Sequence, residues 1–315
     1  MLVDEPQSLR HIEFSCIHFE LEFQETVRLP PGAFLQMRRE LLQVARFLDS
    51  ALEKAPYSAL FDPPLPTDPV VRKRIQRPGP GFVIRGIPPR EHVFDVGDSF
   101  ELTVHFLGGG KNALPDFVEI LKMLGQNGLS QGRGLFDIAT IAGEDPSGRR
   151  YPLCEPNEDL STLAPPILDA QWWLDSAAPV RPSLLDLHFV TPARLVSQGR
   201  PLFRPTFRTI FPFILRRVTS MAQAYCGLEL VENPAATLGA ADRLQVNADT
   251  LRWTDWRRLE GESRSQDLGG VTGSIRLEGS ALEEIYWILK LGSLLQIGKG
   301  AAYGAGRYDV HVLPG

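Results

Sequence analysis

The chain has 315 residues, of which 43% are hydrophobic and 23% charged, as in a globular protein of one or two domains. Its net charge of −5 argues against nucleic-acid binding through overall charge, although a local basic face remains compatible with it. Three isolated cysteines and the lack of a long apolar run argue against a disulfide framework, a cysteine zinc motif and a membrane span, and we expect a cytoplasmic protein.

The first half of the chain alternates predicted strands and helices. Alternating polarity predicts a strand over residues 11–24, and apolar residues at helical spacing predict a helix over residues 33–54. Further along, the pattern predicts a short strand at 82–84, a strand at 98–108, a helix at 114–125 and a strand at 135–142.

The second half repeats this order. We predict a strand at 184–195, a helix at 206–227 interrupted near Pro212, strands at 250–259 and 269–279, a helix at 281–298 and a strand at 307–313. Strand, helix, strand, strand, helix, strand is the order of a ferredoxin-like unit. Both halves end as helix, glycine loop and strand, with Gly134 and Gly306 about half the chain apart, which indicates an internal duplication.

The predicted fold class is therefore α+β, with tandem ferredoxin-like (RRM-like) βαββαβ domains and a C-terminal glycine-rich loop. The expected N-terminal domain covers residues 1–145 and the C-terminal domain residues 183–315. Residues 146–182 are expected to form a connecting segment, because they are rich in proline, glycine and charge.

The glycine-rich loop lies in "LLQIGKGAAYGAGRYDV" near the end of the chain. It lacks the Ser or Thr that follows the lysine of a P-loop, and it precedes a strand, whereas a P-loop follows one. Too few residues follow for a dinucleotide-binding unit. Two interpretations remain: a flexible cationic loop whose amides and tyrosine rings bind a nucleic-acid backbone, or a tight turn that lets helix and strand pack.

Several stretches together resemble a known family, above all "WTDWRRLEGESRSQDLGGVTGSIRLEG" and "IGKGAAYGAGRYDV". The chain resembles the CRISPR-associated RAMP proteins, and among them the pre-crRNA-processing endoribonucleases of the long two-domain kind. The resemblance implies binding of CRISPR repeat RNA and cleavage without a metal or cofactor. In that reaction a 2′-hydroxyl attacks the adjacent phosphate and leaves a 2′,3′-cyclic phosphate.

The resemblance leaves two alternatives open. The chain could be a catalytically inactive RAMP subunit that binds crRNA within an effector complex, or a scaffold that only contacts partner proteins. Other CRISPR effector subunits are implied partners, and relatives can form homodimers.

The reaction needs an acid, a base and cations, and histidine is the usual acid or base near neutral pH. Many relatives carry their histidine on or near the first helix, whereas this chain has none between His18 and His92. The catalytic candidates are His18, His311, Tyr303 and Lys299. His105 and His188 lie at similar places in the two halves and are interpreted as strand histidines that face solvent or the core.

The expected RNA-binding residues are glycines of the loop and basic or aromatic residues. They are Gly298, Lys299, Gly300, Gly304, Gly306, Arg307, Trp256, Arg257, Arg258, Arg264, Arg72 and Arg74. Arginines beside aromatic rings suit a nucleic-acid backbone with stacked bases.

Overall fold

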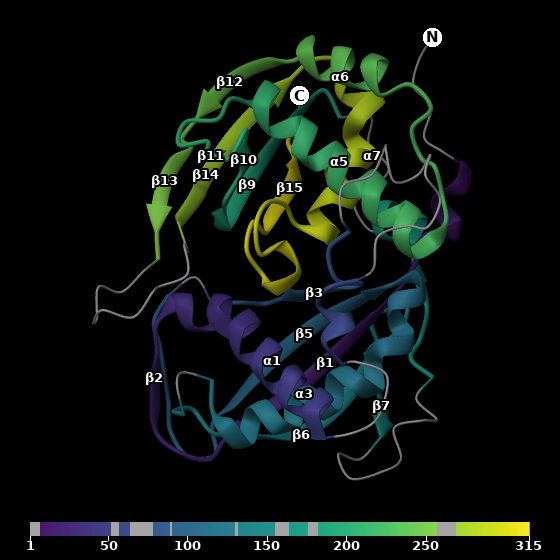
Figure 1. Ribbon diagram of the computed structural model, residues 1–315. Coiled ribbons are helices and arrows are strands. Elements are labelled where there is room, and N and C mark those ends of the chain that lie inside the picture. Colours follow the sequence, from purple (N-terminus) through teal and green to yellow (C-terminus); the bar gives the residue numbers. More distant parts are fainter. Residues whose placement is uncertain are drawn as a thin grey trace. The chain divides into compact units, whose positions relative to one another are not determined.

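The computed structural model describes residues 7–51, 57–63, 78–88, 90–129, 132–154, 164–175, 182–256 and 269–314. Its contacts divide the chain into two units. We call residues 13–168 the N-terminal unit, and residues 169–256 and 269–314 together with residues 7–12 the C-terminal unit. The boundaries expected at residues 145 and 182 remain a prediction. Figure 1 labels most of the helices and strands of both units.

The N-terminal unit is built on one antiparallel sheet in the order β3-β5-β1-β6-β7. Its strands are β1 (Glu13–Phe23), β3 (Phe82–Arg85), β5 (Ser99–Leu107), β6 (Phe136–Glu144) and β7 (Arg150–Cys154). Helix α1 (Pro31–Ala51) follows β1, and α3 (Leu114–Asn127) connects β5 to β6. The first four strands therefore have the ferredoxin-like order, and β7 extends the sheet beyond β6.

Shorter elements complete this unit. The strands β2 (Val27–Leu29) and β4 (His92–Phe94) pair with each other, and β8 (Leu168–Asp169) pairs with β1. Two 3₁₀ turns are η2 (Tyr57–Leu60) and η3 (Gly108–Ala113).

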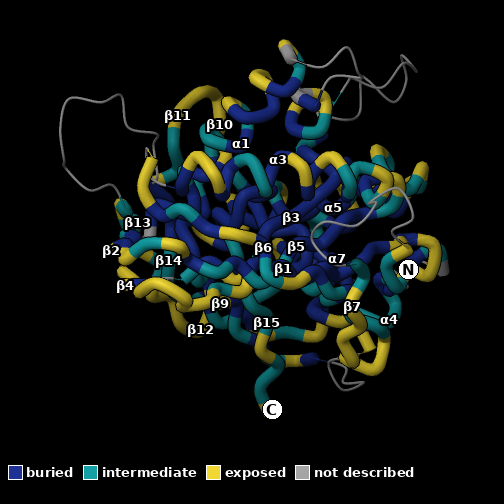
Figure 2. The backbone as a smooth tube through the Cα atoms, turned by 90° about the horizontal axis from the view of Figure 1, so that it is seen from below, coloured by how far each residue is buried: buried dark blue, intermediate teal, exposed yellow. Residues whose placement is uncertain are grey.

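Alternation along β1 divides its side chains between two environments. Phe19 contacts Phe117 of α3, and Phe117 in turn contacts Phe82 and Phe106. All four rings are fully buried, so this face of the sheet forms the core of the unit. Figure 2 colours the backbone by the burial of each residue. The residues of β1 that alternate with Phe19 and its face point to the opposite side of the sheet and are mostly polar.

The C-terminal unit repeats the arrangement with a sheet in the order β12-β14-β9-β15. Its strands are β9 (Leu184–Ala193), β12 (Gln245–Asp249), β13 (Arg252–Asp255), β14 (Gly269–Glu278) and β15 (Tyr308–Val312), with β13 also paired to β14. The helices α5 (Phe207–Cys226), α6 (Pro234–Asp242) and α7 (Leu282–Leu295) contact one another. The predicted tandem ferredoxin-like fold is confirmed in this strand order.

The remaining elements of this unit are short. They are η1 (Gln7–His11), α4 (Ala170–Asp175), the hairpin β10 (Val196–Ser197) and β11 (Arg200–Pro201), and η5 (Ala301–Tyr303). None of the described helices is long and apolar enough to cross a bilayer.

Three details differ from the sequence-based expectations. Helix α5 continues through Pro212, because the proline is exposed and the carbonyl it leaves unpaired belongs to the exposed Arg208. Residues 146–182, expected to connect the domains, contain β7, β8 and α4. The pattern also missed α6 and β12, because α6 is alanine-rich and all five residues of β12 are exposed.

Candidate functional site

The glycine-rich loop runs from Gln296, just after α7, to Arg307, just before β15. Arg217 of α5 donates from Nε to the carbonyl of Leu295 at 3.3 Å, and so supports the end of α7. Burial lowers the pKa of Arg217 to about 10. This half-buried guanidinium at the helix end holds the start of the loop in place.

The loop contacts the end of β9 through its backbone. The amides of Lys299 and Gly306 donate to the carbonyls of Arg194 and Pro192 at 2.9 and 3.0 Å. Thr191 donates to the carbonyl of Gly304 at 2.7 Å and accepts from the amide of Arg307 at 2.8 Å. These hydrogen bonds hold the loop against the end of β9.

Most amides of the loop are already used by these contacts or by turns within the loop. The amides of Ile297, Tyr303, Gly304 and Ala305 donate to loop carbonyls. An amide that donates within the fold is not available to a ligand, so contact of these amides with a phosphate would require the loop to open. The tight-turn interpretation describes the backbone better.

Two cationic side chains of the loop lie toward the surface. Lys299 is exposed, and Arg307 is half-buried with Nη2 at 3.4 Å from Asp309 Oδ2. Tyr303, by contrast, is only 3% exposed. Its predicted contact with RNA would therefore require the loop to open.

The strand β15 continues from this loop and brings two histidines together. In the register of β15 and β9, His311 lies opposite Asp186 and Asp309 lies opposite His188. The two histidines are therefore diagonal neighbours on one face of the sheet. Residues in such diagonal positions of an antiparallel pair are typically about 7–8 Å apart. Both are exposed.

We call this face the polar stripe: Asp186, His188, Ser274, Arg276, Asp309 and His311. His188 Nδ1 lies 2.8 Å from Ser274 Oγ on β14, which leaves Nε2 facing outward from that contact. Arg276 holds Asp186 with two hydrogen bonds of 2.9 Å each. This guanidinium, together with the positive charge that His311 and His188 can carry, keeps the pKa of Asp186 below its usual range.

An aromatic group lies beside the end of β9 in the same unit. The ring centroids of Phe203 and Trp253 are 4.6 Å apart, and the guanidinium of Arg194 lies 5.8 Å from the Trp253 ring. Phe203 is 58% exposed. An exposed ring with a cation beside it is suited to stacking against a base.

The candidate His18 lies in the N-terminal unit, in a different kind of environment. It is 6% exposed, with Nε2 at 2.8 Å from Glu144 Oε2 and Nδ1 at 3.3 Å from Glu101 Oε1. Thr103 Oγ1 lies 3.2 Å from the same Nδ1. Both ring nitrogens are therefore engaged, which weakens the case for His18 as an acid or base toward RNA.

The other histidines have simpler roles. His105 is buried, and burial holds its pKa well below its usual range, so it is a neutral side chain of the fold. His11 and His92 are exposed, as expected of surface residues. The interpretation of His188 as a solvent-facing strand histidine is correct for its position, but it did not identify His311 as a neighbour.

The predicted RNA-binding arginines fall largely outside the described residues. Arg72 and Arg74 lie in segment 64–77, and Arg257, Arg258 and Arg264 lie in segment 257–268. Trp256 follows β13 and is half-buried. Sequence reasoning also missed Phe203, because a single aromatic residue in a proline-rich turn gives no periodic signal.

The architecture of both units defines the class of the protein, a tandem ferredoxin-like protein with a glycine-rich loop before its last strand. A family model of the CRISPR-associated endoribonuclease Cas6 matches residues 187–308, and a second model, described as an N-terminal domain, matches residues 12–166. The match over residues 187–308 supports a place for the chain among the Cas6 and related CRISPR-associated RAMP proteins. No curated protein matches the sequence.

Solved structures share the fold at low sequence identity. A partial Cas6-RT-Cas1–Cas2 complex matches with a TM-score of 0.60 at 13% identity, over 99% of this chain and 47% of that chain. The chain thus spans about half of that relative, and 30% of the one in the Cas6-RT-Cas1–Cas2 complex.

Two further structures are close to this chain in length. A Cas6 product complex has a TM-score of 0.51 at 18% identity and covers 94% of this chain and 99% of its own. A Cas6 of Thermus thermophilus has the same TM-score at 16% identity, over 95% and 98%. These likenesses establish a shared fold.

Proposed function

We propose that this chain is an endoribonuclease that cuts CRISPR repeat RNA and that the polar stripe of the C-terminal unit is its reaction centre. The observation that carries this proposal is the pair of exposed histidines, His188 and His311, on neighbouring strands of one sheet face. RNA cleavage by an internal 2′-hydroxyl needs one group to accept a proton and another to donate one. The match of residues 187–308 to the model of the Cas6 endoribonucleases supports this class of reaction.

The proposed steps use only side chains of this chain and the RNA. One histidine removes the proton from the 2′-hydroxyl, and the 2′-oxygen forms a bond to the adjacent phosphorus. The bond from phosphorus to the 5′-oxygen breaks, and the second histidine gives its proton to that oxygen. The products are a 2′,3′-cyclic phosphate and a 5′-hydroxyl.

Cations at both ends of the polar stripe would stabilise the negative charge that develops on the phosphate. Arg307 lies at the loop end of the stripe and Arg276 at the other, each beside a carboxylate. Lys299 is exposed on the loop and would hold the RNA backbone. Of the candidates from the sequence, His311 and Lys299 therefore keep proposed roles, whereas the burial of Tyr303 and the contacts of His18 favour structural roles.

The rings of Phe203 and Trp253 would hold bases of the strand next to the cut. Stacking on an aromatic ring contributes about 1–3 kcal/mol per base without depending strongly on sequence. Both belong to the same unit as the polar stripe.

The test is cleavage of a labelled CRISPR repeat RNA in EDTA, read on a denaturing gel. We expect one cut that is lost when the nucleotide before it carries a 2′-deoxy sugar. We expect H188A and H311A each to slow cleavage about 10²–10⁴-fold. H92A, which removes an exposed histidine of the other unit, is the matched control and should cleave like the wild type.

Two outcomes would count against the proposal. Unchanged cleavage by both H188A and H311A would remove the reaction centre from the polar stripe. A gel shift by the wild-type protein without any cut would instead identify an inactive RAMP subunit that binds crRNA.

A further inference from the structure

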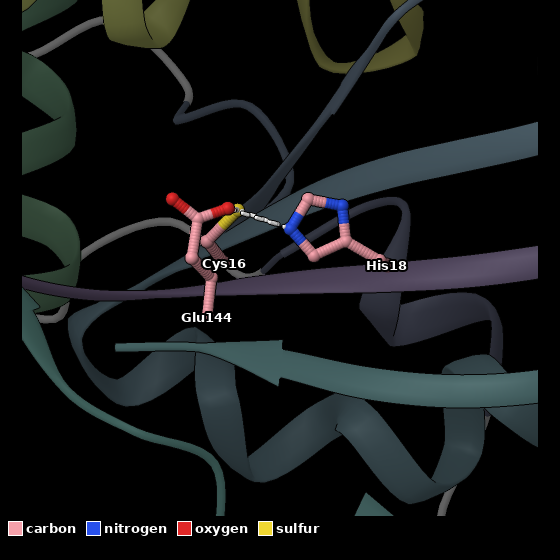
Figure 3. Close-up of side chains that lie close together, drawn as sticks. All are labelled: Cys16, His18 and Glu144. Atoms are coloured by element: carbon pink, nitrogen blue, oxygen red, sulfur yellow. Dashed lines mark hydrogen bonds and ion pairs between the residues drawn. The ribbon is translucent and has the colours of Figure 1, made fainter. Parts of the chain in front are cut away.

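Three side chains of the N-terminal unit converge outside the proposed reaction centre. They are Cys16 and His18 on β1 and Glu144 at the end of β6, shown in Figure 3. In the register of these strands Cys16 lies directly opposite Glu144, and His18 lies two residues further along the same face of β1. The backbone thus fixes three potential metal ligands at one place.

The ligand atoms lie close to the spacing that a metal ion requires. Cys16 Sγ lies 3.5 Å from His18 Nε2 and 3.9 Å from Glu144 Oε2, and the last two atoms are 2.8 Å apart. Zinc bonds of about 2.0–2.3 Å at tetrahedral angles place such atoms roughly 3.3–3.6 Å apart. Shifts of about half an ångström would therefore admit an ion between them.

The surroundings of His18 also match those of a metal-binding histidine. Its Nε2 faces the other two ligand atoms, and its Nδ1 faces Glu101 Oε1 at 3.3 Å and Thr103 Oγ1 at 3.2 Å. Histidines that bind zinc commonly donate their other N–H to a carboxylate, which fixes the tautomer that leaves the ligating nitrogen unprotonated. Glu101 is itself held by Arg150 of β7.

Burial further distinguishes this cluster from a group of surface acids. Cys16 and His18 are each 6% exposed, whereas the side chain of Glu144 keeps 24% exposure. The carboxylate side therefore gives solvent access, through which an ion could enter and a water molecule could complete the coordination. Among the described residues, this is the group of His, Cys, Asp and Glu that meets metal-binding spacing.

We propose that Cys16, His18 and Glu144 bind one Zn²⁺ ion that links β1 to β6, with Glu101 as the carboxylate that positions His18. Thiolate, imidazole and carboxylate together favour zinc among the common divalent ions. On binding, the Sγ–H bond of Cys16 breaks, its proton goes to solvent, and the sulfur bonds to the metal. The site lies in the other unit from the polar stripe and takes no part in the proposed cleavage.

The sequence predicted no such site, because the spacing of its cysteines shows no zinc motif. Cys16 and Glu144 are 128 positions apart and become neighbours only through the pairing of β1 with β6. Cysteine, histidine and glutamate residues that are so far apart in the sequence do not by themselves predict a metal site.

The test uses the full chain, freed of metal and titrated with Co²⁺ and then Zn²⁺. We expect saturation at one Co²⁺ per chain, with a thiolate-to-cobalt charge-transfer band and the visible bands of tetrahedral cobalt, followed by displacement by Zn²⁺. C16S should lose the charge-transfer band. C226S, which changes a cysteine of the other unit, should keep it.

The positioning role of Glu101 has its own readout. E101Q should keep the charge-transfer band but weaken metal affinity about 10–100-fold, because the ligands remain while the support of His18 is reduced. Zn²⁺ should also raise the Tm of the wild-type chain and leave that of C16S unchanged.

Several results would overturn the proposal. They are the lack of saturable Co²⁺ binding by the wild type, a charge-transfer band that survives in C16S, or one that disappears in C226S. If circular dichroism shows that C16S does not fold, E144Q carries the test: a large loss of affinity supports the site, and undiminished affinity refutes it. These measurements do not involve RNA, so they are independent of the proposed cleavage.

Discussion

Asp186 illustrates how single residues of the polar stripe depend on one another. It receives two hydrogen bonds from Arg276 and lies opposite His311. Its carboxylate therefore holds a cation in place and gives an adjacent histidine a negative neighbour. Removing it should therefore affect the stability of the sheet.

We predict that D186N lowers stability in a pH-dependent way. Because Arg276 lowers the folded-state pKa of Asp186, the pair stabilises the fold above the unfolded-state pKa of about 4 and loses this effect as pH falls through the folded-state value. The midpoint of urea unfolding of D186N should thus lie below that of the wild type at pH 7 and approach it near pH 3. An equal difference at both pH values would contradict this prediction.

A second prediction at the residue scale concerns base stacking. F203A should weaken binding of single-stranded repeat RNA about 5–100-fold, because the variant loses a ring that is 58% exposed beside Trp253. F47A removes a ring of similar exposure on α1 of the other unit and should bind RNA like the wild type. Fluorescence anisotropy with labelled RNA measures both, and equal affinities would show that Phe203 does not contact the RNA.

At the scale of elements, the glycine-rich loop is a tightly packed connection between α7 and β15. Gly306 has φ of 65°, and a Cβ at this position would overlap the carbonyl oxygen of Ile297. Gly298 has φ of 86°, and its Cβ would lie 2.7 Å from the carbonyl oxygen of Arg194. Glycine is required at both positions, for backbone conformation and for close contact with neighbouring backbone.

The loop therefore supports a stability prediction. G306A should destabilise the chain by more than about 1 kcal/mol, since strain at positive φ is combined with overlap of backbone atoms. In G239A the new methyl group would meet no atom within 4 Å on α6, and the variant should be neutral or stabilised by up to about 1 kcal/mol. Thermal unfolding compares the two, and a G306A protein as stable as the wild type would show that the loop is not held as described.

For the whole molecule, a net charge of −5 means that RNA must be held by local groups of positive charge. Lys299 of the loop is one such group among the described residues. Phosphate contacts of this kind release counterions from the RNA, so that affinity falls with rising salt.

We predict that K299A weakens RNA binding and makes it less sensitive to salt. The slope of log K against log salt concentration should become shallower by about 0.7, the effect of losing one phosphate contact on a single strand. Binding measured from low to moderate salt tests this. A parallel line with an unchanged slope would show that Lys299 does not contact a phosphate.

The sequence by itself determined the order of elements, because hydrophobic periodicity depends only on neighbouring residues. It predicted β1, β5, α3, β6, β9, α7 and β15, and with them the duplicated ferredoxin-like fold. It also located the glycine-rich loop. Hydrophobic periodicity did not predict α6 and β12, because neither has a clear pattern of alternating apolar and polar faces.

Only the tertiary structure decided which side chains meet. Strand register placed His188 beside His311 and brought Cys16 opposite Glu144, and a shift of one residue would have turned these groups to the other face. In the folded chain both ring nitrogens of His18 lie near carboxylates, and most amides of the loop donate hydrogen bonds within the fold. Periodicity reports the face on which a residue lies, whereas pairing between distant strands sets its neighbours, and the chemistry of the site depends on those neighbours.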